Sequence, residues 1–216
     1  MEHNRQGVQD ACAAYTIEEK RDTAYEDFLT RNNKHMVRVS EYQKYWGDGQ
    51  TDPRLDEILD NIRMEREQVD GFDPASAGAQ QERQEFRSAN DAAVAGLVSL
   101  LTDEYDLHVQ HAQDSGLSEI ASSLEEQREA AARITATSFP GTGDHVEMTT
   151  AHGEETEGLV MQMEEADAQV RERHDVREVG DDKNTIQVLY SVITCQQELR
   201  INGEDYMDAL VELGGR

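Results

Sequence analysis

Apolar residues recur every three or four positions along most of the 216-residue chain, which is the spacing of one buried face of an α-helix. The first such segment follows a capping box, in which Thr16 is the N-cap and Glu19 lies three residues later. A long helix is predicted from this point to the glycines of WGDG. Its expected apolar face contains Tyr25, Leu29, Met36 and Val39.

Two further helices follow signals of a similar kind. In TDPRLDEILDNI, Asp52 is a favourable N-cap and Pro53 suits the first helical position, while DGFDP marks the end. A longer helix is predicted from GAQQER to HVQHAQ, and SGL is the break before a fourth. The three apolar stripes are Leu55, Leu59, Ile62 and Val69; then Val94, Val98, Leu101, Tyr105, His108 and Ala112; then Ile120, Leu124, Ala131 and Ile134.

The pattern changes in the last third of the chain. Residues 139–154 are rich in glycine and threonine and have no helical period, which is typical of a junction or a functional loop. A fifth stripe follows at Leu159, Met163, Ala166 and Val170. TIQVLYSVIT alternates like a strand, but the continuation CQQELR favours a helix over residues 184–200. INGED is expected to be a turn before a short helix with Met207, Leu210 and Val211 inward.

These elements predict a mainly α fold. We expect a helical bundle with long N-terminal helices and a smaller C-terminal helical segment. The expected organisation is a bundle over residues 1–138, a connecting loop over 139–154 and a C-terminal helical segment over 155–216.

The charge changes the picture, because 46 acidic residues face 20 basic ones and give a net charge of −26. Residues 1–50 carry −2 of this charge and the rest of the chain carries −24. Such a surface repels nucleic acid and anionic membranes. Acid excess with arginine preferred to lysine resembles the proteins of salt-in halophiles, in which molar salt screens the repulsion within about 3 Å. We therefore expect a fold that is weakened at low salt.

Other features of composition restrict the environment. The two cysteines, Cys12 and Cys195, lie far apart and outside any CxxC motif, which favours a reduced compartment over a disulfide. The N-terminus has no pattern of a signal peptide, and the longest apolar run has ten residues, half of a membrane span. We expect no membrane association and a location inside a cell or inside a particle.

Two histidines provide the one arrangement that suggests a metal. Glu104, His108 and His111 share a helix face at positions i, i+4 and i+7. However, a di-iron bundle needs Glu-x-x-His on two helices, and the chain contains no Glu-x-x-His. His108 also continues the apolar stripe of its helix. A packed histidine is the favoured interpretation, no metal or cofactor is predicted, and a metal site is the alternative.

A basic and aromatic segment in the first helix is the favoured contact surface. Six of the twelve aromatic residues lie between Tyr15 and Trp46. The expected partner-binding residues, placed opposite or beside the apolar face, are Lys20, Arg31, Lys34, Arg38, Tyr42 and Trp46. They suit an acidic partner such as a neighbouring subunit. The alternative is a solvated face that is neutralised within the helix, for example by Asp27 and Arg31 at i and i+4.

Nothing in the chain forms a P-loop, a nucleophile elbow or a recognisable catalytic triad, so no enzyme activity is expected. The order of helices over residues 16–138, with a short helical tail, resembles the head–tail connector (adaptor) proteins of tailed viruses. This resemblance is one of layout and composition, and it implies a homo-oligomer that contacts neighbouring assembly proteins. The predicted function is a structural protein of a large assembly, preferably a virion component such as a head–tail connector, adapted to high salt. The resemblance accordingly implies a location in a virion, and the cytoplasm is the alternative. The alternatives are a cytoplasmic adaptor of a halophile and a metal-binding four-helix protein.

Overall fold

The computed structural model describes residues 2–45, 52–135, 151, 154–162 and 185–214, and for residues 2–12, 41, 44, 45 and 185 it describes the backbone alone. Every regular element in these ranges is helical. The long helices are α1 (Glu2–Tyr45), α2 (Pro53–Asp70), α3 (Ala79–Asp114), α4 (Ser118–Ala131) and α7 (Thr185–Gly214). A further helical segment covers residues 154–162. The prediction of a mainly α helical bundle is confirmed.

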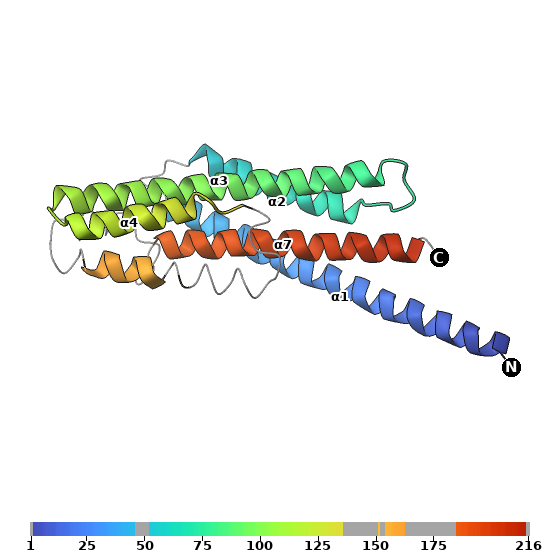
Figure 1. Cartoon of the computed structure of the whole chain (residues 1–216). Coiled ribbons are helices and arrows are strands. Elements are labelled where there is room, and N and C mark those ends of the chain that lie inside the picture. The colour runs from blue at the N-terminus through green and yellow to red at the C-terminus, as the bar shows by residue number, and fades with distance from the viewer. Residues whose placement is uncertain (1, 46–51, 136–150, 152–153, 163–184, 215–216) are drawn as a thin grey trace.

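Four of the helices form the bundle, in the order α1, α2, α3 and α7 around its axis (Figure 1). Neighbouring helices are antiparallel. Along α1 and α7, for example, Tyr25 meets Tyr206 and Arg38 meets Ser191. α4 folds back along α3 (Figure 1). The C-terminal segment expected over 155–216 therefore contributes α7 as the fourth helix of the bundle.

The local signals that begin and end α2 act as the sequence predicts. The Asp52 side chain accepts a hydrogen bond from the backbone N–H of Arg54 at 2.9 Å, and Pro53 occupies the first helical position. Gly71 follows the last residue and its N–H returns to the carbonyl of Glu67. The break between α3 and α4 is equally local, because Gly116 has a φ of 74°, which glycine adopts at little cost.

The predicted start of the first helix is wrong. α1 begins at Glu2, so Thr16 lies inside the helix and does not cap it. The preceding stretch DACAAY contains three alanines and no breaker, and alanine is the strongest helix former. A capping-box pattern inside a continuous helical stretch has no free N–H groups to satisfy.

The predicted turn at INGED is also wrong, because α7 passes through it without interruption. Gly203 is buried against the Phe86 ring of α3, and a β-carbon at residue 203 would lie 2.5 Å from Phe86 Cζ. The glycine thus allows α3 and α7 to approach closely. The alternative of a strand over 184–200 is excluded by the same helix from Thr185 onward.

The core follows the predicted stripes in α2 and α3, whose members are all buried. In α1 the most deeply buried apolar residues are Phe28, Val39 and Tyr42, because α1 packs against both α2 and α7. Tyr25, Leu29 and Met36 are only partly buried beside them. At the other end of the chain Met207 is buried as predicted and Leu210 partly so. Val211, expected inward, is 41% exposed.

The junction predicted at 139–154 and most of the stripe that begins at Leu159 lie outside the described residues. Leu159 itself is partly buried against the core. Within the ranges described above, no helix combines the length and the apolar character required to cross a bilayer.

Candidate functional site

The two arginines of the expected contact surface bind α7 of the same chain. Arg31 forms an ion pair of 2.6 Å with Glu198, whose side chain is 8% exposed. Arg38 Nη1 donates to Ser191 Oγ at 2.6 Å and to Cys195 Sγ at 2.9 Å. In the alternative of a solvated face, Asp27 would neutralise Arg31 within the same helix. In the structure, the partner of Arg31 is Glu198. These guanidinium groups therefore help to hold α1 against α7.

The other expected contact residues lie in different environments. Tyr42 is 2% exposed and belongs to the core, whereas Lys34 and Lys20 are exposed. Trp46 lies outside the described residues. The six residues thus do not form one exposed face, and a role of the exposed members in partner binding stays a prediction.

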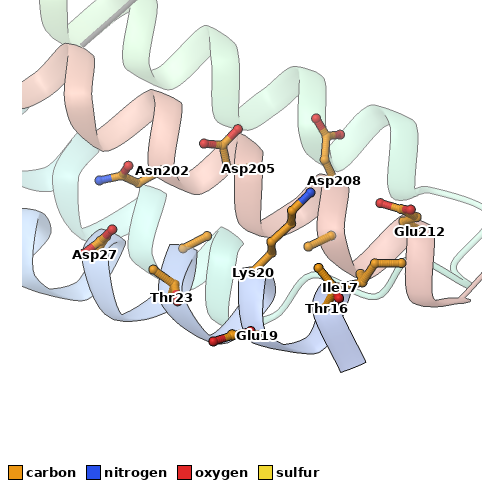
Figure 2. A pocket seen from close by; sticks show the side chains of 12 residues that line it. Thr16, Ile17, Glu19, Lys20, Thr23, Asp27, Asn202, Asp205, Asp208 and Glu212 are labelled. Atoms are coloured by element: carbon orange, nitrogen blue, oxygen red, sulfur yellow. The ribbon is translucent and has the colours of Figure 1, made fainter. Parts of the chain in front are cut away.

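Lys20 belongs to a second feature, an open cleft between α1 and α7 with a volume of about 610 Å³. Figure 2 shows Lys20 reaching from α1 toward the Asp208 side of α7. The cleft has small or apolar side chains on its floor, of which Ile17 and Ala209 are buried, and carboxylates on its walls. Its lining residues are Thr16, Ile17, Glu19, Lys20, Thr23, Ala24, Asp27, Asn202, Asp205, Asp208, Ala209 and Glu212.

The helix lengths explain why the bundle is open at this point. α2 reaches α1 only as far as Tyr25, whose hydroxyl donates to Asp70 at the end of α2, at 2.8 Å. Thr16 of α1 and Glu212 of α7 line the same cleft, so α7 ends beside that part of α1. The preceding residues of α1 continue for about 20 Å past it at 1.5 Å per residue. We call residues 13–24 of α1 with residues 202–214 of α7 the open end.

Among the carboxylates of the open end, Asp22 pairs with Arg21, and Glu204 pairs with Arg87 and Arg200. Asp208 pairs with Arg83 of α3. Desolvation, with the nearby charges of Asp208 and Glu204, raises the pKa of Asp205 above its ordinary value. Two large apolar side chains are also exposed here, since Tyr15 is 68% and Val211 is 41% exposed. Exposed apolar side chains of this kind suit the centre of a contact with another protein, and the surrounding carboxylates suit its rim.

His108 is packed in the core, as predicted. It is 2% exposed, and its Nδ1–H donates to the carbonyl of Glu104, one turn earlier, at 2.8 Å. Glu104 and His111 are also buried. Across the described part of the chain, no three His, Cys, Asp or Glu side chains are placed to hold a metal ion together.

A polar cluster in the centre of the bundle was missed by the sequence analysis. It consists of buried residues from all four helices, which we call the core polar cluster: Asn32 and His35 of α1, Glu65 of α2, Asn90 of α3 and Gln196 of α7. His35 and Gln196 are joined at 2.6 Å, and Gln196 Nε2 donates to Glu65 Oε1 at 2.7 Å. The amides of Asn32 and Asn90 donate to the carbonyls of Ile62 and Gln196, each at 3.0 Å.

The sequence does contain a signal for this cluster. Phe28, Asn32, His35, Val39 and Tyr42 follow one another at spacings of four and three, which is the seam of a packed helix. Two polar residues in such a seam indicate a buried polar contact. The partners on α2, α3 and α7 depend on the register between helices, which the seam of one helix does not contain.

Comparison of the chain with protein-family models, with curated proteins and with solved structures found no match.

Proposed function

We propose that the chain is a structural protein of a large assembly and that it docks on other protein subunits through the open end. The observation that carries this proposal is the length of α1, which has 44 residues and continues past the ends of both α2 and α7. Helices that run beyond their own bundle offer a face that another subunit can cover. The proposal gives the chain no catalytic role and no cofactor.

Burial and exposure at the open end support this role. Tyr15 and Val211, next in sequence to the cleft residues Thr16 and Glu212, expose large apolar side chains, and such residues are favourable at the centre of protein interfaces. In a chain with a net charge of −26, association of copies requires that salt screen their repulsion. We therefore propose that docking takes place at high salt.

The preferred setting is a virion, with the chain as a head–tail connector that contacts further copies of itself and neighbouring assembly proteins. This setting rests on the resemblance in helix layout and composition. The net negative charge disfavours nucleic acid as the partner. A cytoplasmic adaptor of a halophile would use the same end to bind one partner.

Sedimentation velocity in molar KCl tests the proposal. Wild type should sediment as an oligomer, and the double change Tyr15→Ser with Val211→Ser should shift it to the monomer. Met64→Ser is the matched control, because Met64 is 45% exposed on α2, away from the open end. Wild type that stays monomeric at every concentration would contradict self-assembly, and a double variant that sediments like wild type would contradict docking through the open end.

A further inference from the structure

The core polar cluster contains a continuous hydrogen-bonded chain between three helices. Gln196 of α7 lies between His35 of α1 and Glu65 of α2, with contacts of 2.6 Å and 2.7 Å. The Gln196 amide nitrogen is the donor to Glu65, so its oxygen faces His35 and can only accept. Neutral His35 therefore carries its proton on Nε2 and leaves Nδ1 unprotonated.

Burial keeps both titratable groups of this hydrogen-bonded series, Glu65 and His35, uncharged near neutral pH. Desolvation raises the pKa of Glu65 to about 8, although the hydrogen bond from the Gln196 amide and the nearby Asn90 amide partly offset this. Desolvation lowers the pKa of His35 to about 4, with a smaller contribution from the positive charge of Arg38. Glu65 is therefore a protonated acid in the folded chain at a pH where surface glutamates are ionised.

Among the described residues of the surrounding helices, the charged groups that could approach Glu65 bind other partners or are exposed. On α1, Arg31 binds Glu198, Arg38 binds Ser191 and Cys195, and Lys34 is exposed. On α2, Arg66 binds Asp70 and Asn33. On α3, Arg87 binds Glu204 of α7. On α7 itself, Arg200 binds Glu204, and burial raises the pKa of the Cys195 thiol.

The Glu65–Gln196–His35 hydrogen bonds are sensitive to protons because of the second oxygen of Glu65 and the second nitrogen of His35. Glu65 Oε2 and His35 Nδ1 are buried and have no hydrogen-bond partner. Loss of the proton from Glu65 would leave an anion on an oxygen without a donor, and gain of a proton by His35 would leave a cation without an acceptor. Each change carries the desolvation cost of a buried charge.

We propose that the Glu65–Gln196–His35 chain is a proton-dependent latch, which holds α1, α2 and α7 together while Glu65 keeps its proton and His35 stays neutral. This proposal is independent of the assembly function. Its effect on stability follows from linkage. The folded chain binds one more proton than the unfolded chain between pH 4.5 and about 8 because of Glu65. It binds one fewer between about 4 and 6.5 because of His35.

The two contributions cancel between pH 4.5 and 6.5, where the latch is strongest. As the pH rises from 6.5 through about 8, the stability that the protonated Glu65 contributes is lost. As the pH falls below 4.5 toward about 4, the stability from neutral His35 is lost.

Urea unfolding of the full chain in molar KCl, followed by circular dichroism at a series of pH values, tests the alkaline half of the latch. From pH 6.5 to 8 the unfolding constant of wild type should rise by up to about tenfold per pH unit. Glu65→Gln keeps the acceptor for Gln196 but has no titrating proton, so its unfolding constant should be nearly flat. Glu67→Gln, an exposed change two residues away on α2, should follow wild type. A Glu65→Gln variant that keeps the wild-type slope would overturn the proposal.

A second measurement needs no variant and so decides the matter even if Glu65→Gln does not fold. In wild type labelled with ¹³C at the glutamate carboxyls, one resonance should titrate near pH 8, far above the remainder. Titration of every glutamate resonance below pH 6 would show that no buried glutamate keeps its proton, and the latch would be excluded.

Discussion

At the centre of the bundle polar side chains are enclosed by four helices, whereas at the open end they line a cleft between two. Glu65 and His35 are fully buried and reach a common partner in Gln196. Asp205 and Lys20 are exposed to solvent at either side of the cleft. The same helices, α1 and α7, form both regions. The difference comes from α2, which accompanies α1 at the centre and ends beside Tyr25.

This difference separates stability from contact. A polar group enclosed in the centre must keep its partner, because water cannot replace a lost hydrogen bond there. A polar group at the open end exchanges a partner for water at little cost, and the same group is available to another protein. The centre is thus suited to holding the helices in register, and the open end is suited to docking.

The largest difference between the two regions is expected for aromatic residues. Phe86→Ala removes a fully buried ring that packs against Phe28 and Gly203, and should lower the free energy of unfolding by about 3–5 kcal/mol. Tyr15→Ala at the open end should change it by less than about 0.5 kcal/mol, since Tyr15 is 68% exposed. Urea denaturation at one salt concentration gives both values. Equal losses would show that the open end is part of the core.

A smaller but more specific effect is expected at Gln196. Gln196→Leu leaves the His35 N–H and the Glu65 carboxyl without their shared partner, which should cost about 2–4 kcal/mol. Asn202→Leu also replaces an amide side chain of α7 by leucine, but at the open end. It should cost less than about 1 kcal/mol. Thermal or urea unfolding provides the comparison. Similar costs for the two variants would contradict the exclusion of water from the core polar cluster.

A triple variant sharpens this result. Replacing His35, Glu65 and Gln196 together by leucine removes every group that would be left unpaired, so much of the stability lost in Gln196→Leu should return. If the triple variant is less stable than Gln196→Leu alone, the cluster contributes more than its buried hydrogen bonds.

The smallest effects concern the charged residues of α1. Arg31→Glu places a second carboxylate beside the nearly buried Glu198 and should cost about 1–2 kcal/mol. Lys34→Glu, on the exposed face three residues later, should stay within about 0.5 kcal/mol of wild type. Unfolding in the same molar salt measures both. A Lys34→Glu variant that loses as much as Arg31→Glu would show that the two residues share one surface.

Local signals made most of the fold predictable from the sequence. α2 and the break after α3 depend on Asp52, Pro53 and Gly116, which act through their own backbone, so a reading of the chain finds them. Gly203 was misread as a turn because its role is to admit the Phe86 ring from a residue far away in sequence. The prediction that α1 begins at Thr16 was wrong because threonine is favoured at N-caps, although this threonine lies within a continuous helix.

The candidate sites were less predictable, for the same reason. Periodicity places Arg31 and Arg38 on one side of a helix, but it does not say that α7 covers that side with Glu198 and Ser191. The cleft likewise exists because three helices differ in where they end. Such differences are a property of register and length in the assembled bundle.

Hydrogen–deuterium exchange along α1 in molar KCl tests the contrast between the two regions most directly. In dilute solution, amides of residues 13–24 should exchange at least about tenfold faster than those of residues 28–42, because the first range borders the open cleft beside α7, whereas both α2 and α7 pack against the second. At concentrations where the chain associates, residues 13–24 should become protected while residues 28–42 stay unchanged. Equal protection along α1 in dilute solution, or association that leaves residues 13–24 as exposed as before, would contradict the account.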